Sequence, residues 1–150
     1  MPYHYTESGL DNVVLVNGYE VENHPEYGEL VSINNIRGLH DAIGLEIVNL
    51  TRPLNGAEFR YLRLELDLSQ RALATVLGTN EQSIAKWEKA RTKAVANKAA
   101  ERFLRVMYLE HCDAESKVGI MIKRLAELDS HIGDMEMRLE MHGSDWSKAA

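Results

Sequence analysis

Apolar residues recur at helical spacing over residues 58–91 and predict three short amphipathic helices there. The positions expected to mark their apolar faces are Phe59, Leu62, Leu64 and Leu66 in the first helix, Ala72, Leu73, Val76 and Leu77 in the second, and Ile84, Ala85 and Trp87 in the third. Each helix has one apolar and one polar side, so the three are expected to pack around a shared core.

The residues between these helices predict where each one starts and stops. Ser69 and Asn80 are residue types that cap helix N-termini, and Gly78 suits the positive φ that often ends a helix. The second and third helices are therefore separated by a turn of about three residues that contains glycine. This is the spacing of a helix-turn-helix.

The first 56 residues predict a small module of mixed structure. Residues 13–16 and 19–22 are strand-like and flank Asn17-Gly18, a dipeptide favoured in type I′ hairpin turns. Residues 30–33 predict a third strand. Asn35 is expected to cap a helix over residues 36–50, with Leu39, Ile43, Ile47 and Leu50 on one stripe.

A further helix is expected over residues 97–111. It would direct a set of apolar residues to the core and Arg102 and Arg105 outward. The apolar residues are Ala99, Ala100, Phe103, Leu104 and Met107.

The tail carries an apolar heptad stripe that predicts a dimerising C-terminal helix over residues 113–142. The stripe consists of Val118, Met121, Leu125, Leu128, Ile132, Met135 and Leu139. In a parallel pair of such helices, Arg124 and His131 would face Asp129 and Glu136 of the other copy, so the pattern favours a parallel homodimer. The alternative is a helix that folds its stripe onto its own domain. Residues 143–150 are expected to be a disordered tail.

Charge is distributed unevenly along the chain. The net charge is −6, yet residues 57–105 hold 10 basic and six acidic side chains, a net charge of +4. Residues 1–56 carry −6 and residues 106–150 carry −4. Because the local field decides where a polyanion docks, the middle of the chain is the expected contact surface.

Enzyme chemistry finds little support in the sequence. The six histidines lack metal-ligand spacing, and one cysteine, Cys112, allows neither an intrachain disulfide nor a Cys-x-x-Cys zinc site. No glycine-rich loop could hold phosphates, so no enzyme activity and no cofactor are expected. There is no evident secretory signal and no apolar run of about 20 residues, which predicts a cytoplasmic protein without a membrane partner.

The order of residue types from Ser69 to Arg91 resembles the Xre/Cro-type helix-turn-helix family. Matching elements are Ser69-Gln70, Leu73-Ala74, Leu77-Gly78 and the run from Ile84 to Trp87-Glu88. The resemblance implies that the third helix enters the major groove of double-stranded DNA. A structural three-helix unit that binds no DNA is the alternative.

The same resemblance implies roles for individual residues. Bases would be read by Asn80, Glu81, Gln82, Ser83 and Lys86, with Gln82 suited to adenine and Lys86 to guanine. Phosphates would be held by Ser69, Gln70, Arg71, Lys89, Arg91 and Lys93. Gln70 could instead brace Gln82, and Trp87 is expected to pack inside.

The N-terminal residues, YHYTESGLDNVVLVNGYEV, followed by Gly38-Leu39-His40, resemble those of MqsA-family antitoxins and related regulators. The zinc-binding cysteines of well-known members are missing from this N-terminus. The resemblance implies a small module ahead of the DNA-binding domain and a protein toxin as a partner.

Together these patterns predict a mainly α fold with a small N-terminal β-hairpin module. Residues 1–54 would form that α/β module, 55–111 the helix-turn-helix domain and 113–142 the dimerisation helix. The expected function is a dimeric, sequence-specific DNA-binding transcriptional regulator, acting as a repressor. One alternative is an antitoxin that neutralises a protein toxin and autoregulates its operon. Another is an effector-sensing role for residues 1–56, which would require a pocket.

Overall fold

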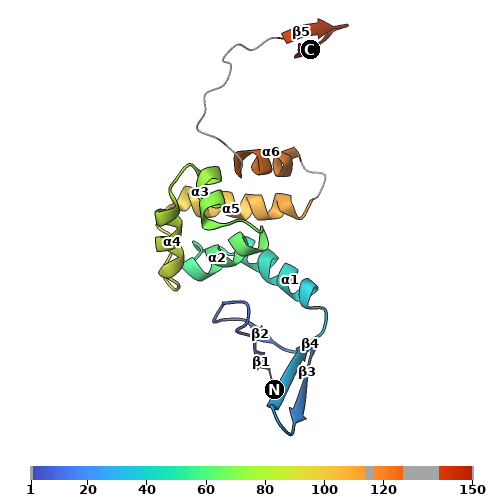
Figure 1. Ribbon diagram of the computed structural model, residues 1–150, viewed down its shortest axis with the longest axis vertical. Helices are drawn as coiled ribbons and strands as arrows, with labels where there is room; N and C mark the ends of the chain where they lie inside the picture. The colour runs from blue at the N-terminus through green and yellow to red at the C-terminus, as the bar shows by residue number, and fades with distance from the viewer. Residues whose placement is uncertain (1, 114–116, 127–138, 150) are drawn as a thin grey trace.

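The computed structural model describes residues 2–113, 117–126 and 139–149 of the chain. Within them lie six helices: α1 (Ile36–Val48), α2 (Gly56–Glu65), α3 (Gln70–Leu77), α4 (Glu81–Lys89), α5 (Lys98–His111) and α6 (Lys117–Ala126) (Figure 1). The described strands form two-stranded antiparallel pairs. They are β1 (Tyr3–His4) with β2 (Val14–Leu15), β3 (Tyr19–His24) with β4 (Gly28–Ile33), and β5 (Leu139–His142) with β6 (Asp145–Lys148). The expectation of a mostly helical chain with small N-terminal hairpins is confirmed.

One hydrophobic core joins the N-terminal segment to all six helices. Its fully buried members are Leu54, Phe59, Leu62, Leu73, Ile84, Leu104 and Met107. Helix α1 packs against α2 and α5, and α6 packs against α3 and α5. Two inward predictions are wrong, because Leu64 and Ala99 are exposed. Leu64 follows Leu62 by two positions, which turns it to the opposite side of α2.

The segment between α1 and α2 is attached to the helical body by the Leu54 side chain and by hydrogen bonds to its backbone. The Leu54 side chain is fully buried, and the Leu54 carbonyl accepts a hydrogen bond of 2.8 Å from the Val95 amide. Arg105, expected to point outward, instead donates to the carbonyls of Leu50 and Arg52, each at 2.6 Å. Arg105 thereby supplies donors to backbone carbonyls just beyond the C-terminal end of α1. At the other end of α1, the side chain of the predicted N-cap, Asn35, accepts a hydrogen bond from the Gly38 amide.

The predicted hairpin around Asn17-Gly18 is wrong. Strand β2 pairs with β1, and β3 pairs with β4 through the turn that follows His24. A type I′ turn needs positive φ at both central residues. Gly18 has a φ of 81°, but Asn17 is not among the described non-glycine residues with positive φ. The dipeptide therefore lies in the connection between β2 and β3 and does not form a hairpin turn.

The C-terminal region also differs from the expected helix over residues 113–142. The structure describes α6 over Lys117–Ala126, and Leu139 lies in β5, which pairs with β6 across Gly143-Ser144. Gly143 has a φ of 66°, which a tight turn accepts, so residues 145–148 are a strand and not part of a disordered tail. Leu128, Ile132 and Met135 lie outside the described residues.

The residue of α6 that is buried against the domain, Ile122, is not part of the heptad stripe expected to form a dimer. Ile122 is 8% exposed and joins the core, whereas Val118 and Met121 of the heptad stripe are exposed. Leu125 is half-buried against the core. The described part of the stripe is thus split between the domain and the surface.

Candidate nucleic-acid interface

Local hydrogen bonds set the ends of α3 and α4. The Ser69 hydroxyl accepts from the Ala72 amide at 3.0 Å, and the Asn80 side chain accepts from the Ser83 amide at 2.8 Å. Gly78 ends α3 with a φ of 71°. These are the predicted caps, and they are confirmed. They place α4 directly after a short turn, so its first residues are presented at the surface.

The inner side of α4 packs tightly on α2. Ile84 is fully buried, and the Trp87 ring meets the Phe59 ring edge-on, with 5.7 Å between centroids. Gly56, the first residue of α2, lies so close that a Cβ there would be 2.2 Å from the Trp87 carbonyl oxygen. Only glycine fits at this contact, and the end of α4 is therefore fixed against the start of α2.

A buried polar network lies beneath the same helices. The Arg63 guanidinium donates to both carboxylate oxygens of Glu88, at 2.7 and 2.8 Å, and to the Leu68 carbonyl at 2.9 Å. Gln70 adds a hydrogen bond of 3.2 Å to Glu88. The Glu88 carboxylate of α4 therefore accepts hydrogen bonds from residues of both α2 and α3. Sequence reasoning assigned no role to Arg63, although it follows Phe59 and Leu62 at the spacing of the inner side of α2.

The predicted base-reading residues lie at the start and along the outer side of α4. Glu81, Gln82 and Lys86 are exposed, and Ser83 is half-buried. Gln82 and Lys86 are four residues apart and so share one side of the helix, away from buried Ile84 and Glu88. Asn80 is exposed at the N-cap. This side is exposed at Gln82 and Lys86 and can therefore meet a groove.

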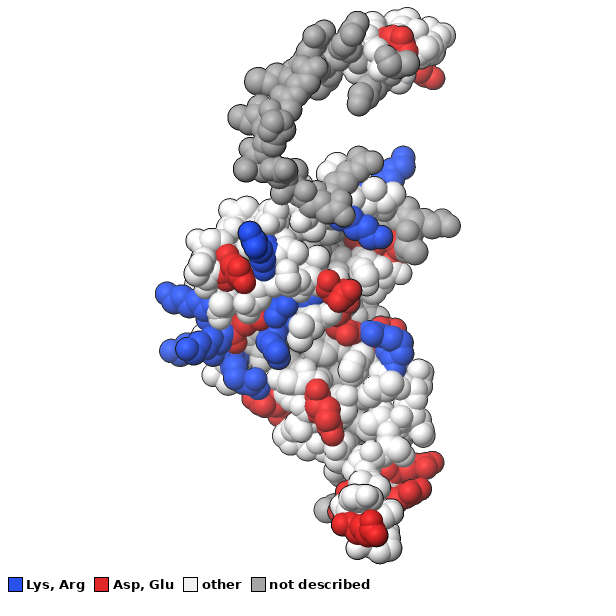
Figure 2. Space-filling view, viewed as in Figure 1, with Lys and Arg blue, Asp and Glu red and all other residues white. Residues whose placement is uncertain are grey.

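The predicted phosphate-binding residues fall into two groups. Ser69, Arg71, Lys89 and Lys93 are exposed, and basic side chains gather around α4 in Figure 2. Two others are engaged within the protein. Gln70 donates to Glu88 rather than bracing Gln82, and Arg91 contacts the N-terminal segment.

The Arg91 contact joins the exit of α4 to the loop before β2. Its Nη2 donates to the Gly9 carbonyl at 3.0 Å and to the Asp11 carboxylate at 3.2 Å. Both side chains of this ion pair remain largely exposed. Asp11 therefore occupies a guanidinium that a DNA phosphate could otherwise bind.

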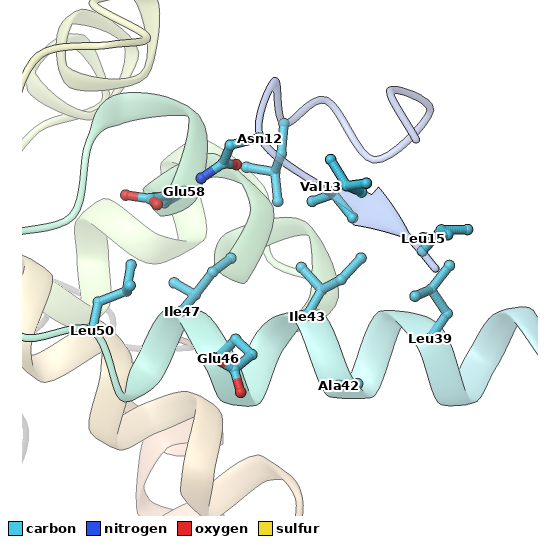
Figure 3. A pocket seen from close by; sticks show the side chains of 12 residues that line it. Asn12, Val13, Leu15, Leu39, Ala42, Ile43, Glu46, Ile47, Leu50 and Glu58 are labelled. Atoms are coloured by element: carbon cyan, nitrogen blue, oxygen red, sulfur yellow. The ribbon is translucent and has the colours of Figure 1, made fainter. Parts of the chain in front are cut away.

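An apolar groove of about 370 Å³ separates the same N-terminal segment from α1 (Figure 3). Val13, Leu15, Ile43 and Ile47 point into it, and Glu46 belongs to its lining. Among the residues that the structure describes, no group of three or more His, Cys, Asp or Glu side chains could hold a metal ion. None of the described helices is long and apolar enough to cross a membrane.

Residues 59–103, from α2 into α5, match the family model described as Helix-turn-helix. This part of the chain is a helix-turn-helix domain of the Xre/Cro type, which implies DNA binding and belongs to a family typically without catalytic activity. No curated protein and no solved structure matches the chain. The comparisons give no support to the resemblance to MqsA-family antitoxins.

Proposed function

We propose that this protein is a sequence-specific, DNA-binding transcriptional regulator that acts as a dimeric repressor of its own promoter. The observation that carries the proposal is the outer side of α4. It is exposed at Gln82 and Lys86, while its inner side is held by the buried Arg63–Glu88 pair. A rigidly supported helix with a free polar side, in a domain that matches the helix-turn-helix family, is suited to a major groove.

Direct reading would come from the first turns of α4. The Gln82 amide can donate to and accept from adenine, and Lys86 can donate to guanine. Glu81 can accept from the amino group of cytosine. Asn80 and Ser83 would reach bases or sugars from the helix start. We expect Gln82 to contribute most to sequence specificity. Loss of its bidentate contact would weaken discrimination at that base pair by about 1–3 kcal/mol.

Phosphate contacts would flank these bases on both sides of α4. Arg71 lies on α3, Lys89 is the last residue of α4 and Lys93 follows it, whereas Arg91 would bind a phosphate only after leaving Asp11. Such contacts set the position of a protein on DNA without reading sequence. The carboxylates of the N-terminal residues would repel DNA and so confine it to the basic side.

The proposed repressor binds a palindromic operator as a homodimer, with two copies of α4 about 34 Å apart in successive major grooves. In this proposal the heptad stripe from Val118 to Leu139 supplies the pairing, and its members Val118 and Met121 are exposed on α6. Sedimentation of the full chain and of a chain ending at Ala126 tests this directly. An unchanged dimer in the shorter chain would rule out the tail as the pairing element.

The function itself is tested by fluorescence anisotropy with the DNA upstream of the gene, across a salt series, beside a random duplex of equal length. We expect tight, salt-dependent binding that favours the upstream DNA. The Gln82→Ala, Lys86→Ala double variant should lose this preference, whereas Lys117→Ala, which removes a charge from α6, should keep it. Equal binding of both duplexes by the native protein would contradict sequence-specific recognition.

A second candidate is an antitoxin that neutralises a protein toxin and autoregulates its operon. The observation that favours it is the charge of the N-terminus, where no lysine or arginine precedes Arg37 and six carboxylates do. A small basic toxin encoded next to this gene would support this function. Co-expression of the two proteins would then relieve the growth arrest caused by the toxin alone.

A further inference from the structure

The β3–β4 hairpin extends from the helical body (Figure 1). Every residue from Glu20 to Leu30 is exposed. Among the described residues, each of these two strands pairs only with the other. A strand in that position presents backbone donors and acceptors on its outer edge, which is a template for an added strand.

The hairpin is preorganised by its own turn and by its base. His24 Nδ1 accepts hydrogen bonds from the amides of Glu26 and Tyr27, and the His24 and Tyr27 rings lie 4.7 Å apart. At the base, the Tyr19 ring packs on the Tyr3 ring, with 5.4 Å between centroids. A partner would therefore meet a formed edge and would not have to order it.

Apolar side chains remain uncovered on this formed hairpin. Register pairs Val21 with Val31 on one face and Glu22 with Leu30 on the other. Val21 is 46% exposed, Leu30 43% and Tyr27 70%. An isolated two-stranded hairpin is only marginally stable in water, so covering these side chains would stabilise it.

The charge of the hairpin decides what can cover it. Its carboxylates are Glu20, Glu22, Glu26 and Glu29, and it contains no lysine or arginine. Acidic side chains are visible at this end of the molecule in Figure 2, away from the basic side chains around α4. DNA would be repelled here, and a second copy pairing edge to edge would set like charges against each other. Only a cationic segment complements the edge.

We propose that the β3–β4 hairpin is a docking surface for a cationic segment of another protein, which pairs with β3 as an extended strand. Lysine or arginine side chains of the partner face Glu20 and Glu22, and an apolar side chain covers Val21. Strand β3 is the edge used because its carboxylates alternate with Val21 at the spacing of a strand. Docking at β3 leaves α4 available, so it does not require DNA binding and does not prevent it.

The test uses the full-length, ¹⁵N-labelled protein and a short synthetic peptide of alternating lysine and valine. We expect the peptide to shift backbone amide signals of residues 19–33, and a peptide with glutamate in place of lysine to leave them unchanged. Shifts centred outside the hairpin, or none at all, would overturn the proposal.

Matched variants separate docking at β3 from general attraction. Glu20→Gln with Glu22→Gln removes the two β3 carboxylates and should weaken peptide binding by roughly fivefold. Glu26→Gln with Glu29→Gln removes the same charge from the turn and β4 and should weaken it less. Equal losses in both variants would reject pairing at β3. All four residues are exposed, so both variants should fold. Both variants should also bind DNA as the native protein does, so a loss of peptide binding can be distinguished from a failure of the proposed regulatory function.

Discussion

Arg63 and Glu88 form a buried, bidentate ion pair that joins α2 to the helix proposed to enter the major groove. Both side chains are almost fully enclosed, and the third guanidinium nitrogen of Arg63, Nη1, donates to the Leu68 carbonyl. A buried pair contributes little net stability when compared with apolar side chains of the same size. Its effect here is geometric, because the two parallel hydrogen bonds define how α4 sits on α2.

Removing one member of the pair should lower the free energy of unfolding by far more than the small net contribution of the intact pair. Glu88→Ala leaves the Arg63 charge buried without a partner and should lower the free energy of unfolding by about 3–5 kcal/mol. Urea denaturation measures this. Glu81→Ala, on the exposed side of the same helix, should change stability by less than about 0.5 kcal/mol. A similar small change in both variants would show that water reaches Arg63.

Gly56 should tolerate no side chain. A Cβ at Gly56 would meet backbone atoms, 2.2 Å from the Trp87 carbonyl oxygen and 3.0 Å from that of Glu88, so the end of α4 would have to move. Gly56→Ala should lower the free energy of unfolding by about 1–3 kcal/mol and weaken DNA binding. Thermal denaturation and anisotropy test the two effects. The neighbouring change Ala57→Gly should cost no more than about 1 kcal/mol and leave DNA affinity unchanged.

Asp11 should compete with DNA for Arg91. In Asp11→Asn the guanidinium is released to bind a phosphate, and because an exposed ion pair is worth about 0.2–1 kcal/mol, DNA affinity should rise by up to about fivefold. Glu7→Gln changes the net charge equally without touching Arg91 and provides the control. If anisotropy shows the same gain for both variants, the gain reflects overall charge rather than this contact.

Tyr108 should make the fold sensitive to alkaline pH. Burial raises the pKa of Tyr108 to about 12, and the nearby Cys112, Glu65 and Asp41 act in the same direction. In the unfolded chain a tyrosine titrates near pH 10. The unfolded state therefore loses its proton first, and the free energy of unfolding should fall as the pH rises from about 10 to 12. Urea denaturation at several pH values should show this fall, and a smaller one for Tyr108→Phe.

Burial also raises the pKa of Tyr61, whose hydroxyl donates to the His40 carbonyl at 2.7 Å. Some alkaline sensitivity should therefore persist in Tyr108→Phe. An identical pH dependence in that variant and in the native protein would contradict a role for Tyr108.

Features that depend on neighbours in the chain were predictable. Ser69, Gly78 and Asn80 act within one turn of their own positions, and their caps follow from residue type alone. The apolar spacing of α3, α4 and α5 follows from helical geometry in the same way. The polarity that exposes Gln82 and Lys86 is likewise local, so the outer side of α4 could be foreseen.

Pairings between distant residues were not predictable. Val14 follows a strand pattern that fits several partners, and its pairing with His4 depends on how the N-terminal segment lies on α1. The same holds for Arg105, whose acceptors lie more than 50 residues earlier in the chain. Sequence spacing carries no signal for such contacts.

Residue types and their spacing were enough to locate most helix ends, the helix-turn-helix domain and the basic segment of the chain. Each of these depends on local hydrogen bonds, side-chain period or composition. Three other features became visible in the folded chain: Arg63 donates to Glu88, Arg91 donates to Asp11, and α6 packs on α3 and α5. Such contacts join residues far apart in the chain, because the packing of the whole core selects each partner and no single position encodes that packing.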